Sequence, residues 1–372
     1  MKLLMDTQVF DNQKFGGISR YYAEFLLRIN TSLKEVCPLE FTDNFHIKEC
    51  FPELKSMGFF DKLPYYFKGD FLKRKKNNRL KSINYANTIK LLKAQDFDVF
   101  IPTYYDCYFL EHIKNKPFVI TIYDMIHELM TDYITQDAEL VENKRILIEK
   151  ATKVIAISKS TKNDILSLYP HIESDKIEVV YLSESIKETK QVKLNLPKKF
   201  VLFVGNRDQY KNFNFFVESM LPLIEKHKDL YIVSAGGGKF RKRELKYLKQ
   251  FQDHKKILQF DFKDYELINY YSNAICFVFP SMYEGFGIPV LEAMKARCPV
   301  ILANHSSFPE VAEQAALYFD LDDKEDLKDK INKFIEDENL RESYITRGVV
   351  QASKFSWDKT TDACIGIYKS VI

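Results

Sequence analysis

Short apolar runs alternate with helical patterns in two separate series along this chain of 372 residues. Runs of about four to eight apolar residues closed by polar turns are typical of buried parallel strands, and the amphipathic stretches between them are typical of covering helices. Residues 184–199, ESIKETKQVKLNLPKK, are polar and aperiodic and separate the two series. The pattern therefore predicts two Rossmann-like domains. The expected strands lie at 2–8, 98–105, 116–124, 153–158 and 177–183, and then at 200–206, 230–238, 256–262, 275–279 and 299–304.

Length and composition agree with this division. A chain of 372 residues exceeds what one hydrophobic core usually accommodates, and 46% hydrophobic with 29% charged residues is ordinary for a soluble globular protein. No apolar run approaches a membrane-spanning length, and the first ten residues lack the apolar core of a signal peptide. The six cysteines are scattered, without a Cys-x-x-Cys pair, which indicates a reducing cytoplasm and argues against a zinc site.

A basic segment stands out in a chain whose net charge is only +3. Residues 68–81, KGDFLKRKKNNRLK, carry seven basic residues and one aspartate, with aromatic residues beside them from position 65 onward. Basic residues next to aromatic ones suit an anionic membrane surface, where each contributes about 1 kcal/mol. A solvated loop is the alternative. We therefore expect either peripheral membrane contact through 65–81 or such a loop, and no binding of nucleic acid.

Residues 276–294, CFVFPSMYEGFGIPVLEAM, predict a ligand site at the carboxyl end of a strand, where open α/β sheets bind ligands. Gly285 and Gly287 lack side chains, so a ligand can approach the backbone, and the N-terminus of the following helix favours an anion. Glu284 and Glu292 can accept hydrogen bonds from hydroxyl groups. A phosphorylated, polyhydroxylated ligand such as a nucleotide sugar suits this arrangement, although a strand, a glycine turn and a helix also occur in doubly wound proteins generally.

The segment resembles the Glu-x7-Glu signature of retaining glycosyltransferases of the GT-B fold, specifically those of family four. The family pattern, a hydrophobic strand followed by PS-x-x-EGFG-x-P-x-LEAM, is matched over residues 280–294. The resemblance implies that Glu292 holds the ribose hydroxyls of the donor. It also implies that the transferred sugar is held by Glu284 and by the backbone of Gly285, Phe286 and Gly287.

A second loop extends the resemblance. VGNRDQYKN, residues 204–212, is similar to the VG-x5-KN loop of the family, whose basic residues hold the donor diphosphate. A turn at Gly205 after a buried strand, with Lys211 beside a helix start, also makes an anion site on physical grounds. Many relatives place an arginine where this chain has Asn206, and here Arg207 follows one position later. Lys211 and Arg207 are therefore the expected diphosphate ligands.

The N-terminal half shows two further similarities. FGGISRY, residues 15–21, is similar to the glycine loop near the diphosphate and acceptor, where Gly16 and Gly17 permit close backbone approach. Arg20 in this loop either contacts phosphate or pairs with Glu24 one helical turn away.

TIYDMIHE, residues 121–128, corresponds to a segment in which relatives often have a histidine followed by an aspartate near the donor sugar. The resemblance implies a catalytic contribution from Asp124. Tyr123 stands in place of the histidine, and His127 follows three residues after Asp124. Arg297 is another departure, because relatives usually have glycine there, and a positive φ would strain an arginine.

Together these patterns predict an α/β protein of the GT-B fold, with two Rossmann-like domains facing a central cleft. The expected units are an N-terminal acceptor-side domain over 1–185, a C-terminal nucleotide-sugar-binding domain over 186–355, and a crossover helix over 356–372 that packs on the N-terminal domain. The expected catalytic residues are Glu284, Lys211, Arg207 and Asp124.

The expected activity is transfer of a hexose or deoxyhexose, with retention of configuration, from a GDP- or UDP-linked donor to a glycan or lipid-linked glycan in polysaccharide or O-antigen assembly. Basic side chains and a helix dipole would stabilise the leaving diphosphate, so no metal ion or cofactor is expected. Two alternatives stay open: a sugar-nucleotide epimerase of the GT-B fold, and a non-catalytic nucleotide-sugar-binding partner. The expected location is the cytoplasm or the inner face of the membrane.

Overall fold

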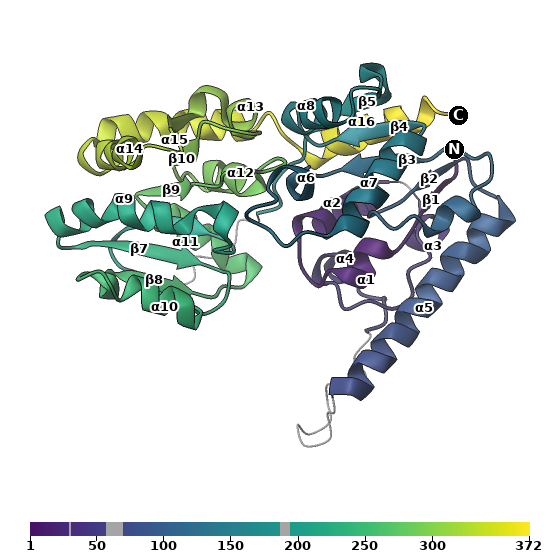
Figure 1. Cartoon of the computed structure of the whole chain (residues 1–372), viewed down its shortest axis with the longest axis horizontal. Helices are drawn as coiled ribbons and strands as arrows, with labels where there is room; N and C mark the ends of the chain where they lie inside the picture. The colour runs from purple at the N-terminus through teal and green to yellow at the C-terminus, as the bar shows by residue number, and fades with distance from the viewer. Residues whose placement is uncertain (30, 57–69, 187–193) are drawn as a thin grey trace.

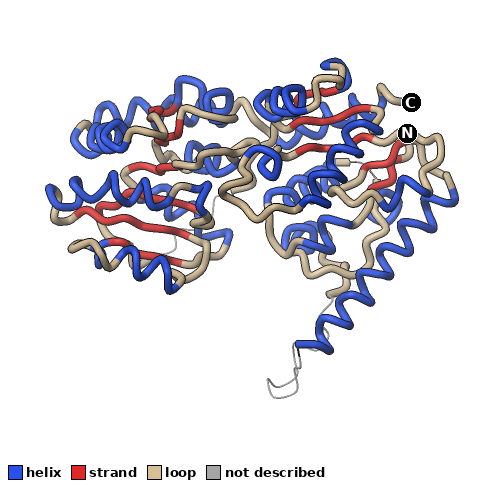
Figure 2. Tube along the Cα trace, viewed as in Figure 1, coloured by secondary structure: helices blue, strands red, loops and turns tan. Residues whose placement is uncertain are grey.

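Two parallel-sheet domains lie side by side in the computed structural model, which describes residues 1–29, 31–56, 70–186 and 194–372 (Figure 1). Helices flank the strands in both domains (Figure 2). The basic segment 65–81 therefore lies partly outside the described residues.

The strands of the N-terminal domain are parallel and follow the order β1-β2-β3-β4-β5. A bridge between Phe100 and Phe118 joins the β1-β2 pair to the other three strands. The residues of β1 to β4 are almost all buried, as expected for a parallel sheet covered on both faces. These strands are β1 (Leu3–Met5), β2 (Val99–Ile101), β3 (Val119–Ile122), β4 (Lys153–Ala156) and β5 (Ile177–Val179).

The C-terminal sheet is also parallel, with the order β11-β10-β9-β6-β7-β8. Its first strand, β6, lies in the middle. The next two strands add on one side of β6 and the last three on the other, so the switch point lies between β6 and β9. Doubly wound sheets bind ligands in the crevice outside the carboxyl ends of the strands at this point. These strands are β6 (Lys199–Val204), β7 (Leu230–Ala235), β8 (Ile257–Phe260), β9 (Cys276–Phe279), β10 (Val300–Ala303) and β11 (Ala316–Phe319).

The α-helices cover the sheets and cap the domains (Figures 1 and 2). In the N-terminal half they are α1 (Gln8–Asn12), α2 (Gly17–Arg28), α3 (Leu33–Val36), α4 (Phe45–Cys50), α5 (Asp70–Ala94), α6 (Ile126–Leu129), α7 (Ala138–Lys150) and α8 (Lys159–Leu168). In the C-terminal half they are α9 (Phe213–Lys226), α10 (Lys242–Leu248), α11 (Leu267–Asn273), α12 (Ile288–Lys295), α13 (Phe308–Ala312), α14 (Lys324–Glu336), α15 (Glu338–Ala352) and α16 (Trp357–Lys369). Short 3-10 turns are η3 (Tyr108–Glu111), η4 (Ser174–Lys176), η5 (Gln209–Lys211), η6 (His254–Lys256), η7 (Asp264–Glu266) and η8 (Glu313–Ala315).

Helix α5 corrects the alternative of a solvated loop for the basic segment, because the chain is helical from Asp70 onward. Residues 70–94 contain neither glycine nor proline, and lysine, arginine and leucine are good helix formers. The helix extends away from the rest of the domain at its N-terminal end (Figure 1). In the described part of the chain, no helix combines the length and apolarity needed to cross a bilayer.

The last helix returns to the N-terminal domain, as expected from the sequence (Figure 1). In this contact Tyr21 of α2 and Cys364 of α16 share a hydrogen bond of 3.2 Å, and the rings of Phe25 and Tyr368 lie 5.9 Å apart. Trp357, the single tryptophan, donates through Nε1 to the hydroxyl of Ser185 at 2.8 Å. The chain thus crosses between the two domains twice.

Candidate active site

Lys211 and Glu284 meet at the switch point of the C-terminal sheet. Strands β6 and β9 are neighbours and run in the same direction, so the loops that leave them lie at one edge of the sheet. Gly205 turns the chain out of β6 with φ of +116°, a conformation that favours glycine. The Nζ of Lys211 donates to the carboxylate of Glu284 in a short ion pair, and each side chain is 16% exposed. Two residues from separate loops therefore form one charged pair.

The surroundings of Lys211 favour its charged form. Burial disfavours the Lys211 ammonium, but the carboxylate of Glu284 and the hydroxyl of Tyr210 outweigh this effect, and the pKa of Lys211 is raised. Burial also raises the pKa of Tyr210, against the influence of Lys211, while Glu284 and Asp124 raise it further. Asp124 of the N-terminal domain therefore contributes to the electrostatics around Tyr210.

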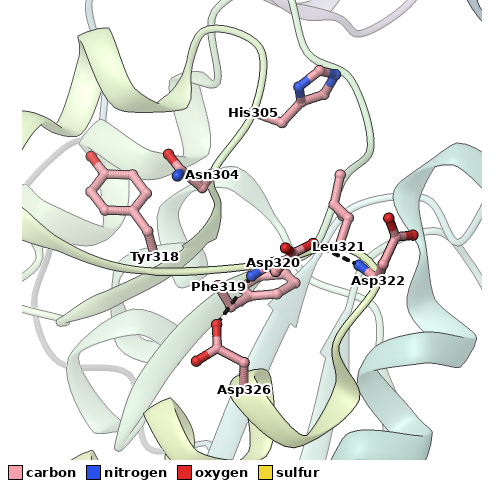
Figure 3. Close-up of a pocket in the computed structure, with 8 residues that line it drawn as sticks. All are labelled: Asn304, His305, Tyr318, Phe319, Asp320, Leu321, Asp322 and Asp326. Atoms are coloured by element: carbon pink, nitrogen blue, oxygen red, sulfur yellow. Dashed lines mark hydrogen bonds between the residues drawn. The ribbon is translucent and has the colours of Figure 1, made fainter.

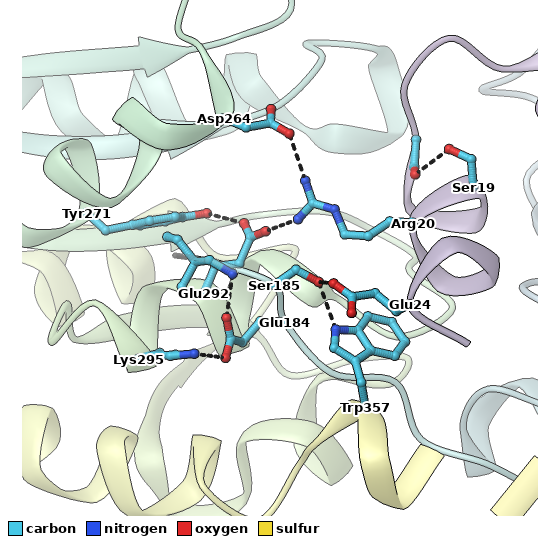
Figure 4. Close-up of polar contacts among 12 residues, drawn as sticks. Ser19, Arg20, Glu24, Glu184, Ser185, Asp264, Tyr271, Glu292, Lys295 and Trp357 are labelled. Carbon is cyan, nitrogen blue, oxygen red and sulfur yellow. Dashed lines mark hydrogen bonds and ion pairs between the residues drawn. The ribbon is translucent and has the colours of Figure 1, made fainter. Parts of the chain in front are cut away.

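Glu292 is held by residues from both domains (Figure 4). Its Oε1 accepts from Nη1 of Arg20 at 3.1 Å, and its Oε2 accepts from the hydroxyl of Tyr271 at 3.2 Å. The other end of the Arg20 guanidinium donates to Asp264 at 3.2 Å. Burial raises the pKa of Glu292, whereas Arg20 and Tyr271 lower it. Arg20, in the first turn of α2, thus bridges two carboxylates of the C-terminal domain.

Arg20 does not pair with Glu24, which was one of the two alternatives that the sequence left open. Glu24 instead pairs with Arg28 and accepts from the hydroxyl of Ser185 at 2.6 Å. The two domains touch here, and a buried carboxylate on the facing domain attracts the guanidinium more strongly than a partly exposed one on its own helix.

Gly17 begins helix α2 and lies close to the side chain of Ile288, and Gly16 precedes it as the N-cap.

Gly285 brings the two loops of the facing domains into contact. A Cβ at this position would collide with the main-chain carbonyl of Tyr123, so only glycine permits this approach. Gly287 adopts φ of +95° at the N-cap of α12. The segment that carries Asp124 therefore lies directly against the loop that carries Glu284.

Asp124 uses its carboxylate locally, because Oδ1 accepts from the N–H of Ile126 at 3.1 Å at the start of α6. Tyr123 is buried, and its hydroxyl donates to the carbonyl of Thr103 within a cluster of tyrosines. Its side chain therefore packs in the domain and does not take the place of a histidine in the cleft. His127 is half-buried on α6.

The side chains of Arg207 and Phe286 are both buried and contact other residues of the protein. The guanidinium of Arg207 is 2% exposed, pairs with Glu244 at 2.9 Å and donates to several main-chain carbonyls of 236–239. These contacts hold the glycine loop in place, and diphosphate binding by Arg207 stays a prediction. Phe286 is buried between the rings of Tyr181 and Phe355, so its contribution to a ligand comes through the backbone. Arg297 has φ of +61°, so it adopts the positive φ expected at a position where relatives usually have glycine.

Sequence reasoning missed Asp264, Tyr283 and Glu310. Asp264 follows β8, and nothing in its local sequence indicates a partner on the other domain. Tyr283 immediately precedes Glu284, and its hydroxyl accepts from the N–H of Met125 at 3.0 Å and donates to Asp164 at 2.7 Å. The sequence signal that could have identified Tyr283 is its place in the Glu-x7-Glu motif. Glu310 accepts from the N–H groups of Lys159 and Ser160.

A separate cavity of about 490 Å³ lies at the ends of β10 and β11 (Figure 3). Asp320, Asp322 and Asp326 line it, and two of these carboxylates accept from backbone N–H groups of the same loop at 3.0 and 3.1 Å. It contains none of the predicted residues. Three carboxylates would repel a diphosphate, so we do not include this cavity in the candidate site.

Comparison with solved structures identifies the class of fold. HepE from Anabaena, in complex with UDP and glucose, aligns over 100% of both chains with a TM-score of 0.69 at 15% identity. The fold of this chain is that of the GT-B glycosyltransferases.

Comparison of sequences adds a match in the C-terminal half. Residues 184–349 match the family described as Glycosyl transferases group 1. O-antigen chain mannosyltransferase B of Escherichia coli is 42% identical over 106 residues, 28% of this chain and 28% of that protein. The serotype-specific mannosyltransferase WbdA of Escherichia coli is 28% identical over 244 residues, 61% of this chain and 30% of that protein. The chain thus spans less than a third of the length of these two relatives.

Proposed function

We propose that this chain is a retaining glycosyltransferase that moves a hexose or deoxyhexose from a GDP- or UDP-linked donor to a hydroxyl group of a glycan or lipid-linked glycan. The observation that carries the proposal is the charged pair of Lys211 and Glu284 at the switch point, in a loop against which the Asp124 segment lies. Glu292, on the helix after this loop, pairs with Arg20 of the facing domain. A cation beside the start of α9 suits a diphosphate, and carboxylates suit the hydroxyl groups of ribose and sugar. The names of the relatives support a hexosyl donor and a role in O-antigen or polysaccharide assembly.

In the proposed reaction, the bond between the anomeric carbon and the diphosphate oxygen breaks, and the acceptor oxygen bonds to that carbon on the same face. The acceptor proton passes to the departing diphosphate. Lys211 and the N-terminus of α9 would stabilise the charge that develops on the leaving group, so we propose no metal ion or cofactor for this step. Glu284 would orient the sugar, and closure of the two domains would exclude water. This proposal includes no covalent intermediate on the protein.

Nucleotide binding is the first test. The wild-type protein is heated with GDP, UDP, GDP-mannose or UDP-glucose, and the midpoint of unfolding is recorded. A true ligand at 100 times its Kd stabilises the folded state by about 2.7 kcal/mol. We expect one nucleoside diphosphate and its sugar to raise the midpoint, and stabilisation by none of these four or their analogues with other sugars would overturn the proposal.

Turnover distinguishes the proposal from its alternatives. The stabilising donor is incubated with and without a membrane fraction that contains lipid-linked glycans, and the products are followed by NMR. Transfer with the anomeric configuration of the donor is expected only with acceptor. Conversion of the donor into another nucleotide sugar without acceptor would indicate an epimerase, and binding without any turnover would indicate a non-catalytic partner.

A further inference from the structure

Lys144 is a fully buried lysine on α7, next to the candidate site. Its Nζ donates to Oε2 of Glu128 at 3.0 Å and to the main-chain carbonyl of Asp124 at 3.2 Å. It also lies 5.2 Å from the centre of the Tyr105 ring. Burying an ammonium group costs free energy unless it is well paired, so the contacts that Lys144 makes need an explanation.

Stability alone does not explain this buried pair. Glu128 is also buried, and its Oε1 has no hydrogen-bond partner among the described residues. Buried ion pairs of this kind contribute little net stability, because desolvation offsets their attraction, and apolar replacements are often neutral or stabilising. A buried lysine bonded to a main-chain carbonyl does, however, fix the position of that carbonyl.

The carbonyl belongs to a segment that is held at three successive residues. The N–H of Tyr123 donates to the hydroxyl of Tyr105 at 3.1 Å, the carbonyl of Asp124 accepts from Lys144, and the N–H of Met125 donates to the hydroxyl of Tyr283 at 3.0 Å. The carbonyl of Tyr123 meets Gly285 of the facing domain. The segment 123–125 is therefore fixed against the loop that carries Glu284.

We propose that Lys144 is a positioning residue for the sugar subsite. It holds the Asp124 segment in its place beside the loops that carry Glu284 and Lys211. This inference rests on the proposed function. The lysine touches no reacting atom, and its effect passes through the backbone of Asp124. Loss of Lys144 should therefore impair use of the sugar while nucleotide binding by the C-terminal domain persists.

The test compares a single and a double variant with the full-length wild-type protein. Lys144→Met leaves Glu128 buried and unpaired, so its unfolding midpoint should fall. Lys144→Met/Glu128→Met removes both charges, so the midpoint should recover. Both variants lose the bond to Asp124, and we expect kcat to fall at least tenfold in each. Lys150→Met, an exposed lysine of the same helix, is the matched control and should behave as wild type.

Binding measurements separate positioning from unfolding. GDP and GDP-mannose, or UDP and UDP-glucose if these are bound, are titrated by calorimetry. Affinity for the nucleoside diphosphate should stay within twofold of wild type in the double variant, whereas affinity for the nucleotide sugar should fall severalfold. Recovery of kcat together with the midpoint would show a purely structural role and overturn the inference. Failure of the wild-type protein to bind any of the four ligands would instead overturn the proposed function, and the inference with it.

Discussion

Lys211 and Glu284 form one ion pair at the candidate site. We expect Lys211→Ala to weaken nucleoside diphosphate binding about 10- to 100-fold, because it removes a charge-assisted hydrogen bond of about 1.5–3 kcal/mol. Binding of the monophosphate, which lacks the distal phosphate, should change much less. Calorimetric titration with GDP and GMP, or with UDP and UMP, measures both effects.

Lys226→Ala is the control for this substitution, because Lys226 is an exposed lysine of α9 that pairs with Glu336 on the surface. It should bind both nucleotides as the wild type does. Equal losses for the monophosphate and the diphosphate in Lys211→Ala would show that Lys211 does not contact the distal phosphate.

Glu292 presents a second prediction at the level of one residue. Arg20 and Tyr271 each occupy one lone pair of its carboxylate, which leaves an acceptor on each oxygen for a ribose hydroxyl. Glu292→Gln replaces one of these oxygens with a donor, and affinity for the ribonucleotide should fall about tenfold, as for loss of one charged hydrogen bond. The 2′-deoxynucleotide should lose less. If both nucleotides lose affinity equally, Glu292 does not bind the ribose.

The partner of Arg20 could not be predicted from the sequence. Local spacing offered Glu24, four positions away, as one of two alternatives, whereas the structure pairs Arg20 with a glutamate 272 positions away. Glu284, Lys211 and Glu292 could be placed at one site because each follows a strand whose carboxyl end faces the cleft. The partner of Arg20 depends on how the two domains meet, and no local pattern contains that information.

Among the described elements, the parallel strands other than β11 were predicted, and several N-terminal helices were not. Strands are marked by apolar runs that must be buried, whereas α1, α3 and α4 are too short to show a 3.6-residue period. Helix α5 is polar along much of its length, so its sequence lacks the apolar stripe that identifies a packed helix.

Helix α5 carries the basic residues of the segment predicted to contact a membrane, and that contact remains a prediction. Replacing Lys73, Arg74, Lys75 and Lys76 by serine should release the protein from anionic vesicles, because each basic residue near such a surface contributes about 1 kcal/mol. Cosedimentation with vesicles that contain phosphatidylserine measures the change, and binding should also weaken as salt rises. Cosedimentation that the four substitutions leave unchanged would favour a purely solvated helix.

The loop after β9 gives a prediction about the contact between elements. Gly285→Ala would push a methyl group into the carbonyl of Tyr123 and force the two loops apart. We expect kcat/KM to fall at least tenfold, because small displacements of positioned groups are costly in catalysis. Gly366→Ala is the control, since a Cβ at Gly366 meets no atom within 4 Å. Activity of Gly285→Ala equal to that of the control would show that the close approach of the loops is not needed.

At the scale of the whole molecule, a contact between the C-terminal domain and the N-terminus of helix α8 helps to set how the two domains are arranged. The carboxylate of Glu310, on α13, accepts from the N–H groups of Lys159 and Ser160, each at 2.9 Å, and from the hydroxyl of Tyr181 at 3.1 Å. These N–H groups begin α8 and have no partner within the helix, and the helix dipole adds to their attraction for an anion. One carboxylate therefore caps a helix across the domain boundary and favours the arrangement in which Arg20 reaches Glu292.

Removing this cap should loosen the two domains without disturbing either one. Loss of a helix cap costs about 0.5–2 kcal/mol, so in Glu310→Ala the open arrangement should become several times more populated. We expect a larger radius of gyration in small-angle X-ray scattering, a kcat reduced severalfold, and unchanged affinity for the nucleoside diphosphate, whose proposed ligands Lys211 and Glu292 lie on the C-terminal domain. Glu225→Ala, an exposed glutamate of α9, is the control and should match wild type in all three measurements. A radius and a kcat equal to wild type in Glu310→Ala would show that this contact does not govern closure of the cleft.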